Sequence, residues 1–129
     1  MKILYHPIFV HFPIAFYALE LGLLFFWIKK CDEVYRRFAL LSFKLGYGLM
    51  LAVMLTGLVD AKIWSGIHGL AAQHFYAAII VFVVYTLRAF CWKTAPDNGC
   101  SPKVHLAGAI LGNILVGWTA YCGGRLVYQ

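Results

Sequence analysis

Histidine is the residue type in this sequence that is best suited to chemistry. Two of the five histidines, His6 and His11, lie in the stretch HPIFVHFP, which leads directly into an apolar segment. Imidazole is a common ligand of transition metals and of haem iron. The sequence contains no Cys-x-x-Cys-His motif for covalent haem, no phosphate-binding glycine loop and no dinucleotide fingerprint. Binding of a metal or of noncovalent haem is therefore the chemistry that the residue types favour.

The composition places these histidines in a membrane protein. Of the 129 residues, 63% are hydrophobic and only 12% are charged, and the mean hydropathy is +0.78. Soluble domains carry roughly twice that charged fraction, so lipid must replace water around most of the surface. The net charge of +6 does not indicate nucleic-acid binding, because the basic residues lie in short segments beside apolar runs, as topology signals do.

Four apolar segments are long enough to cross about 30 Å of hydrocarbon as helices. They cover about 12–28, 39–59, 75–90 and 104–121. The connections are short, so consecutive helices must be antiparallel neighbours. The sequence therefore predicts an all-α, up-down-up-down bundle of four transmembrane helices that forms one domain over residues 1–129. It shows no clear repeat, although such a bundle can contain weak pseudo-symmetry.

The basic residues predict the orientation in the membrane. One end of the bundle collects Lys29, Lys30, Arg36, Arg37, Lys44, Arg88, Lys93 and Lys103, and the other end only Lys2, Lys62 and Arg125. Because cytoplasmic ends are enriched in Lys and Arg, we expect the first end in the cytoplasm and both termini on the outer, periplasmic side. The expected location is a bacterial inner (cytoplasmic) membrane.

This topology brings four histidines to the outer end. His11 begins the first span and His74 begins the third, which runs parallel to it, so the two are expected at matching depth as axial ligands. His6 and His68 are candidates for a second metal site or simply face water. His105 lies at the inner end and is interpreted as an interfacial or helix-capping residue rather than a ligand.

Four further polar residues deserve notice. Asp60 ends the second span and is expected to orient a ligating imidazole, whereas Arg125 is a candidate partner for a haem propionate or an interfacial anchor. Glu20 lies near the middle of the first span, where we expect it to be protonated or hydrogen-bonded inside the bundle. It is nine residues from His11 and hence on roughly the opposite face. Asn113 is expected to form an interhelical hydrogen bond.

Four motifs resemble a known family. They are His-Pro-x-x-Val-His-Phe-Pro-Ile-Ala at 6–15, Thr56-Gly57-x-x-Asp60, His74 at the start of the third span, and Gly123-Gly124-x-Leu126-Val127-Tyr128. Over nearly its whole length the chain is similar to the bacterial membrane proteins classed as domain of unknown function 2231. The resemblance implies a four-helix inner-membrane protein that binds b-type haem, with His11 and His74 as ligands and Asp60 in support. Family members often carry an acidic residue where this chain has Arg125.

The sequence thus predicts a small b-type cytochrome that carries single electrons between a quinol-linked partner and a periplasmic acceptor. It would act as a subunit or partner of a respiratory or photosynthetic complex, or as a homo-oligomer, rather than as a self-contained enzyme. One alternative is a copper or zinc protein that uses the outer histidines with Asp60. The other is a cofactor-free assembly subunit of a membrane complex.

Overall fold

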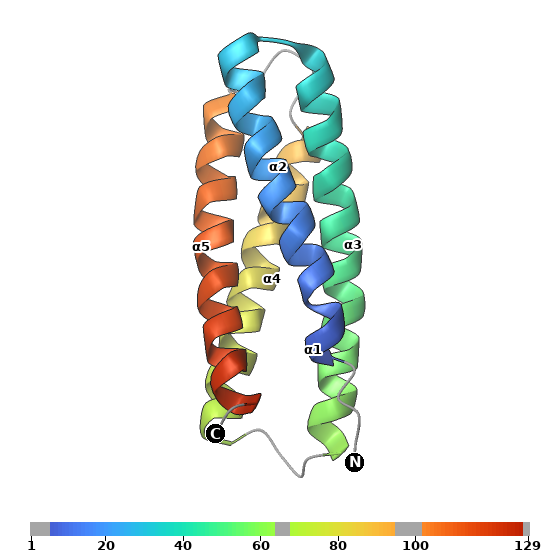
Figure 1. Cartoon of the computed structure of the whole chain (residues 1–129), viewed down its shortest axis with the longest axis vertical. Coiled ribbons are helices and arrows are strands. Elements are labelled where there is room, and N and C mark those ends of the chain that lie inside the picture. Colours follow the sequence, from blue (N-terminus) through green and yellow to red (C-terminus); the bar gives the residue numbers. More distant parts are fainter. Residues whose placement is uncertain (1–5, 64–67, 95–101, 128–129) are drawn as a thin grey trace.

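A computed structural model describes residues 6–63, 68–94 and 102–127, with the backbone alone for 61–63 and 127. This part of the chain is helical and contains no strand. Its elements are α1 (His6–Phe9), α2 (His11–Lys30), α3 (Glu33–Ile63), α4 (Leu70–Thr94) and α5 (Pro102–Val127). The four long helices form one elongated bundle (Figure 1). The predicted all-α four-helix architecture is confirmed.

The first span begins earlier than the apolar run indicated. The short helix α1 starts at His6, with Pro7 in its first turn, where the missing N–H of proline costs little. Val10 then separates α1 from α2. Pro13 has no N–H to donate to the carbonyl of Phe9, four residues earlier, and this explains why the helix is interrupted there. The histidines of the opening stretch therefore both lie on helical backbone.

A tight turn joins α2 to α3. Cys31 ends α2 in the left-handed conformation (φ 52°), and its N–H donates to the carbonyl of Trp27. Asp32 then caps α3, because its carboxylate accepts a hydrogen bond of 2.9 Å from the N–H of Val34. A turn of this kind forces the two helices to run antiparallel, as the short connection predicted.

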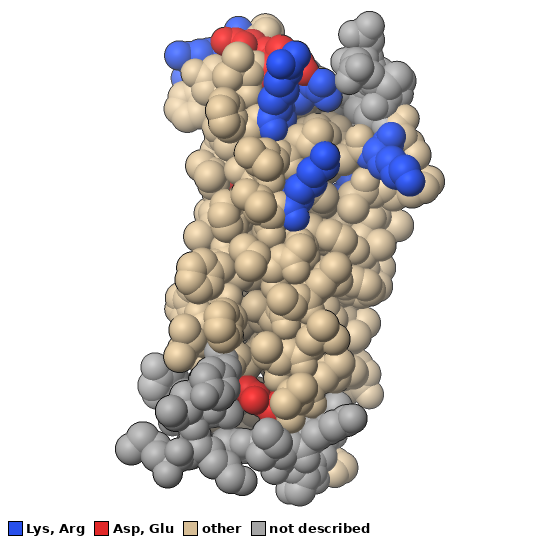
Figure 2. Space-filling model, turned by 90° about the vertical axis from the view of Figure 1, so that its right-hand side faces the viewer, with Lys and Arg blue, Asp and Glu red and all other residues tan. Residues whose placement is uncertain are grey.

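The start of α1 and the end of α5 lie at the same end of the bundle, which we call the terminal end (Figure 1). The opposite end, with the α2–α3 turn, is called the basic end, because Lys and Arg side chains gather towards it on the face shown in Figure 2. Arg88 is an exception to the predicted distribution, since it is buried inside the bundle. Lys2 and the side chain of Lys62 lie outside the described residues.

The helix neighbours determine which side chains can meet on the bundle axis. Helix α2 packs against α3 and α5, and α4 packs against α5 and, less extensively, against α3. Helices α2 and α4 therefore occupy diagonal corners, and their inward side chains meet in the centre. Asn113 links α5 to α2, because its side-chain amide donates to the carbonyl of Tyr17 on α2 (3.3 Å). This confirms the predicted interhelical hydrogen bond.

All four long helical segments are long and apolar enough to cross a membrane. The spans are His6–Lys30, Glu33–Asp60, Leu70–Thr94 and Pro102–Leu126. Their surfaces expose many large apolar side chains, such as Leu55 and Phe90, each 65% exposed. Such a surface is stable in hydrocarbon but not in water. The chain is a multi-pass membrane protein in contact with a lipid bilayer.

Candidate functional site

Two histidines face each other across the terminal end of the bundle. They are His6 on α1 and His74 on α4, whose ring centroids lie 6.0 Å apart with the ring planes at 76°. Both side chains are partly buried. The sequence placed His74 at this position, but it paired His74 with a different histidine.

Each imidazole of this pair is anchored to a backbone carbonyl of the neighbouring helix. Nδ1 of His6 donates to the carbonyl of Val53 on α3 (3.0 Å), and Nδ1 of His74 donates to the carbonyl of Thr119 on α5 (3.0 Å). A carbonyl oxygen can only accept, so the proton must lie on Nδ1 in both rings. The lone pair of the neutral ring is then on Nε2, the arrangement that metal-ligating histidines adopt.

A glycine lies behind each ring of the pair. A Cβ atom added to Gly57 would lie 3.0 Å from Cε1 of His6, and one added to Gly123 would lie 3.0 Å from Cε1 of His74. Both distances are tighter than ordinary van der Waals contact. In each case the glycine lies four residues after the carbonyl that anchors the ring, so the two rings are held in the same way by α3 and by α5.

His11 does not face His74, so the predicted pairing is wrong in this respect. Its side chain is exposed, and its Nδ1 donates to the carbonyl of Pro7 one turn earlier (2.9 Å). Ala15, Ala18 and Gly22, which follow His11 at helical spacing, are exposed as well. The inward face of α2 carries instead Pro13, Tyr17, Glu20 and Leu24. His11 lies on the opposite, lipid-facing side of the helix.

The other residues predicted for this end do not join the pair. His68 and Arg125 are exposed. Asp60 does not accept the Nδ1 proton of either ring, because backbone carbonyls take both, and among the described residues its buried Oδ2 has no hydrogen-bond partner. Across 6–63, 68–94 and 102–127, no three His, Cys, Asp or Glu side chains come together as a metal-binding group.

A buried ion pair lies deeper in the bundle. Glu20 on α2 is fully buried and Arg88 on α4 is 6% exposed. Two hydrogen bonds join them, from Nη2 to Oε1 (2.6 Å) and from Nη1 to Oε2 (3.2 Å). The expected hydrogen bonding of Glu20 inside the bundle is therefore confirmed. The part played by Arg88 was missed, because the sequence reading counted it among the basic residues of the membrane surface.

Two tyrosines stack on the axis between the histidine pair and the ion pair. The rings of Tyr17 and Tyr85 lie 3.9 Å apart, and both are almost completely buried. Each packs on a glycine: a Cβ added to Gly46 would lie 2.8 Å from Cε1 of Tyr17, and one added to Gly112 would lie 2.7 Å from the hydroxyl of Tyr85. The small residues of α3 and α5 thus accommodate side chains from the diagonal helices.

His105 is buried inside the bundle, so the interfacial alternative is wrong. It is 4% exposed at the basic end, and its ring stacks on Trp92 at 3.8 Å. Aromatic stacking and burial account for its position without a ligand.

These positions reveal a repeat that the sequence reading did not detect. Tyr17 follows His6 by 11 residues, and Tyr85 follows His74 by 11 residues. The glycine pairs show the same interval, since Gly57 follows Gly46 and Gly123 follows Gly112 by 11 residues. Eleven residues are close to three helical turns, which keeps each set on one face. The first half of the chain (α1–α3) and the second half (α4–α5) therefore present equivalent residues to the axis.

The chain matches a known protein family. A family model described as "Predicted membrane protein (DUF2231)" matches residues 3–129. No curated protein matches the chain, and no solved structure matches it.

Proposed function

The chain belongs to the DUF2231 family of predicted membrane proteins, and we propose that it is a small b-type cytochrome in which His6 and His74 hold haem noncovalently. The observation that carries the proposal is the pair of imidazoles with anchored Nδ1 and free Nε2. The proposal keeps the haem predicted from the sequence and moves one axial ligand from His11 to His6.

The spacing of the two rings suits an axial pair. If His6 and His74 held a metal from opposite sides, each nitrogen about 2.0–2.1 Å from it, the two nitrogens would lie about 4 Å apart and the ring centres roughly 6 Å apart. The observed centroid distance is 6.0 Å. The equivalent placement of the rings by α3 and α5 supports a shared group on the bundle axis, since each half would contribute one ligand.

The two glycines beside the rings of His6 and His74 also favour haem binding. Gly57 and Gly123 leave no side chain between each ring and its anchoring helix. The rings can therefore lie close to the walls of the bundle, with their Nε2 atoms free of hydrogen bonds from the described residues. Burying two imidazoles with unused lone pairs is unfavourable unless a partner takes them up, and haem iron is such a partner.

His6 and His74 would hold the haem from both sides, and haem held in this way would supply single-electron transfer and leave no position for a substrate. We propose electron transfer rather than catalysis, with the chain as a subunit or partner of a larger respiratory or photosynthetic complex. By the distribution of basic residues, the terminal end faces the periplasm of a bacterial inner membrane. Electrons would then pass from a quinol in the bilayer to a periplasmic acceptor.

A reduced-minus-oxidised absorption spectrum of the purified, haem-replete protein tests this function. We expect a b-type α band that is lost in His6→Ala and in His74→Ala. His11→Ala is the matched control: it removes a histidine five residues from His6 whose ring is exposed and anchored to the carbonyl of Pro7 in α1, so the band should remain. The proposal fails if the wild type is colourless after haem reconstitution, or if the band survives both His6→Ala and His74→Ala.

Copper or zinc held by the same pair is the second candidate, because imidazole also suits these metals. Elemental analysis of the same preparation separates the two: stoichiometric copper or zinc without a haem band would favour it. A preparation without metal and without haem would favour a cofactor-free subunit of a membrane complex.

A further inference from the structure

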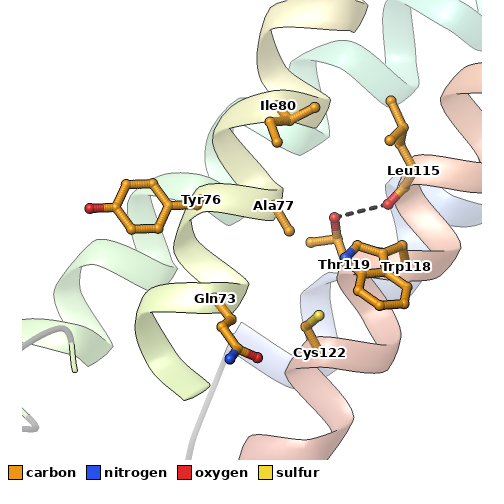
Figure 3. A pocket seen from close by; sticks show the side chains of 8 residues that line it. All are labelled: Gln73, Tyr76, Ala77, Ile80, Leu115, Trp118, Thr119 and Cys122. Carbon is orange, nitrogen blue, oxygen red and sulfur yellow. Dashed lines mark hydrogen bonds between the residues drawn. The ribbon is translucent and has the colours of Figure 1, made fainter. Parts of the chain in front are cut away.

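The second half of the chain carries a pocket of about 320 Å³ between α4 and α5. Figure 3 shows Gln73, Ala77 and Ile80 on the α4 side, and Trp118, Thr119 and Cys122 on the α5 side. The volume is in the range of small-molecule sites, which start at about 300 Å³.

The pocket reflects a difference between the two halves. Counted from the paired histidines, Ala77 takes the position of Phe9, and Ile80 takes the position of Phe12. The first half thus has two large aromatic side chains where the second half has smaller ones. On α5, Trp118 occupies the position that corresponds to Ala52 on α3. At these equivalent positions the second half therefore carries smaller side chains on α4 and a larger, aromatic one on α5.

The pocket opens towards the bilayer. Ile80 and Trp118 at its rim are 52% and 60% exposed, whereas Ala77 and Cys122 at its base are buried. A molecule that reaches this space from the hydrocarbon must be lipid-soluble. The pocket also offers polar groups, namely the amide of Gln73 and the indole N–H of Trp118, which suit a ligand with oxygen acceptors on an apolar ring.

The pocket also lies directly beside one of the paired histidines. Thr119, which lines it, is the residue whose carbonyl accepts the hydrogen bond from Nδ1 of His74 (3.0 Å). Gln73 precedes His74 in the chain. The pocket and the His74 ring thus both contact Thr119, so a molecule in the pocket would lie close to this ring.

We infer that this pocket binds the ring of an isoprenoid quinol or quinone, which gives electrons to the centre at His6 and His74. This inference rests on the proposed haem and names the place where its electron donor binds. Oxidation of one quinol to the quinone releases two electrons and two protons. A haem held by His6 and His74 would supply a one-electron acceptor, so the quinol would give up its two electrons one at a time, the periplasmic acceptor would take each in turn, and water at the terminal end would take the two protons.

The chain itself suggests how to close the pocket. Ala77→Phe and Ile80→Phe each install the residue that the first half has at the equivalent position. Val83→Phe is the matched control, since Val83 lies on the lipid-facing side of the same helix (48% exposed) outside the pocket. Binding is followed by tryptophan quenching with a short-chain benzoquinone in nanodiscs, and electron transfer by the rate at which its quinol reduces the haem.

We expect saturable quenching in the wild type and in Val83→Phe, and an apparent Kd at least tenfold higher in Ala77→Phe and Ile80→Phe. Reduction by quinol should slow by at least tenfold in the two filled variants, while reduction by dithionite and the haem spectrum stay unchanged. Because quenching needs no haem, failure of the haem proposal would leave the binding result intact. Wild-type binding by both filled variants, or quenching that rises without saturation as in a lipid-filled space, would overturn the inference.

Discussion

The two halves of this chain match at the terminal end and differ towards the middle of the bundle. His6 and His74, Tyr17 and Tyr85, and the glycines behind them occupy equivalent positions. Three residues beyond the tyrosines, however, the first half has Glu20 and the second half has Arg88. Equivalent residues that meet on an axis suit a group shared by both halves. Opposite charges at equivalent positions instead make each half the specific partner of the other.

The charge difference also discriminates against wrong pairing. If two first halves packed together, two glutamates would meet in the hydrocarbon, and two second halves would bring two arginines together. Like charges buried side by side cost several kcal/mol. The ion pair of Glu20 and Arg88 therefore selects the association of unlike halves, and the space for the longer arginine comes from Gly108, which lies where the first half has Ser42.

The largest effect is expected from breaking this ion pair. Glu20→Gln or Arg88→Gln leaves one buried charge unpaired and should destabilise the bundle by about 3–5 kcal/mol. The double variant Glu20→Arg with Arg88→Glu restores opposite charges and should recover more than half of that loss. Recovery should be incomplete, because position 42 lacks the space that Gly108 provides. Denaturation in detergent micelles, followed by circular dichroism, measures the differences.

Glu33→Gln serves as the control for this prediction. Glu33 pairs with Arg36 at the exposed start of α3, where an ion pair contributes at most about 1 kcal/mol. If the charge-reversed double variant is as unstable as the sum of its single variants, the pair does not select one half for the other.

An intermediate effect is expected at the glycines beneath the stacked tyrosines. Gly46→Ala and Gly112→Ala place a Cβ within 3 Å of a buried aromatic ring, and overpacking of this kind costs about 1–3 kcal/mol. The two losses should be similar, because the halves are equivalent here. Gly48→Ala and Gly117→Ala meet nothing within 4 Å and should stabilise their helices slightly. The unfolding midpoints of the four variants measure these effects. Clearly different losses in Gly46→Ala and Gly112→Ala would show that the two halves, although alike in geometry, differ in the stability that their glycines provide.

The fold was predictable because hydrocarbon imposes a simple requirement: four apolar runs with short connections leave only an antiparallel bundle. The site was predicted less well, and the error lay in the rotation of α2. The prediction placed His11 on the inward face of α2 because His11 begins the apolar run, although Glu20 lies on the opposite face. A carboxylate in hydrocarbon is the costlier of the two groups to expose, so Glu20 fixes the inward face, and His6, 14 residues before it, shares that face.

Other features could not be obtained from local patterns. Arg88 resembles any basic residue near the end of a span until its partner on a diagonal helix is known. The glycines of α3 and α5 look like sites for close helix packing, and only the three-dimensional arrangement shows that each one accommodates a ring. The repeat was available in the spacing of His and Tyr and of the glycine pairs, but few identical residues carry it.

The smallest effect is expected where the anchors of the paired histidines differ. The carbonyl of Val53 accepts from Nδ1 of His6 (3.0 Å) and also from the hydroxyl of Thr56 (2.8 Å), whose oxygen lies 3.4 Å from the same Nδ1. Cys122 takes the place of Thr56 in the second half. A carbonyl shared by two donors binds each less strongly, so the His6 ring should be the weaker electron donor to a bound iron. In the haem-loaded protein, Thr56→Cys should strengthen the bond from His6 and thereby lower the midpoint potential.

Cys122→Thr should act in the opposite direction by adding a second donor at the carbonyl of Thr119. Both shifts should stay below about 60 mV, which is a tenfold change in a one-electron equilibrium, because each variant alters one hydrogen bond of ordinary strength. Spectroelectrochemical titration of the α band measures them. If the two halves hold their rings in the same way, Thr56→Cys strengthens the hydrogen bond of His6 and Cys122→Thr weakens that of His74. The two shifts must then have opposite signs, and shifts of the same sign would contradict this account.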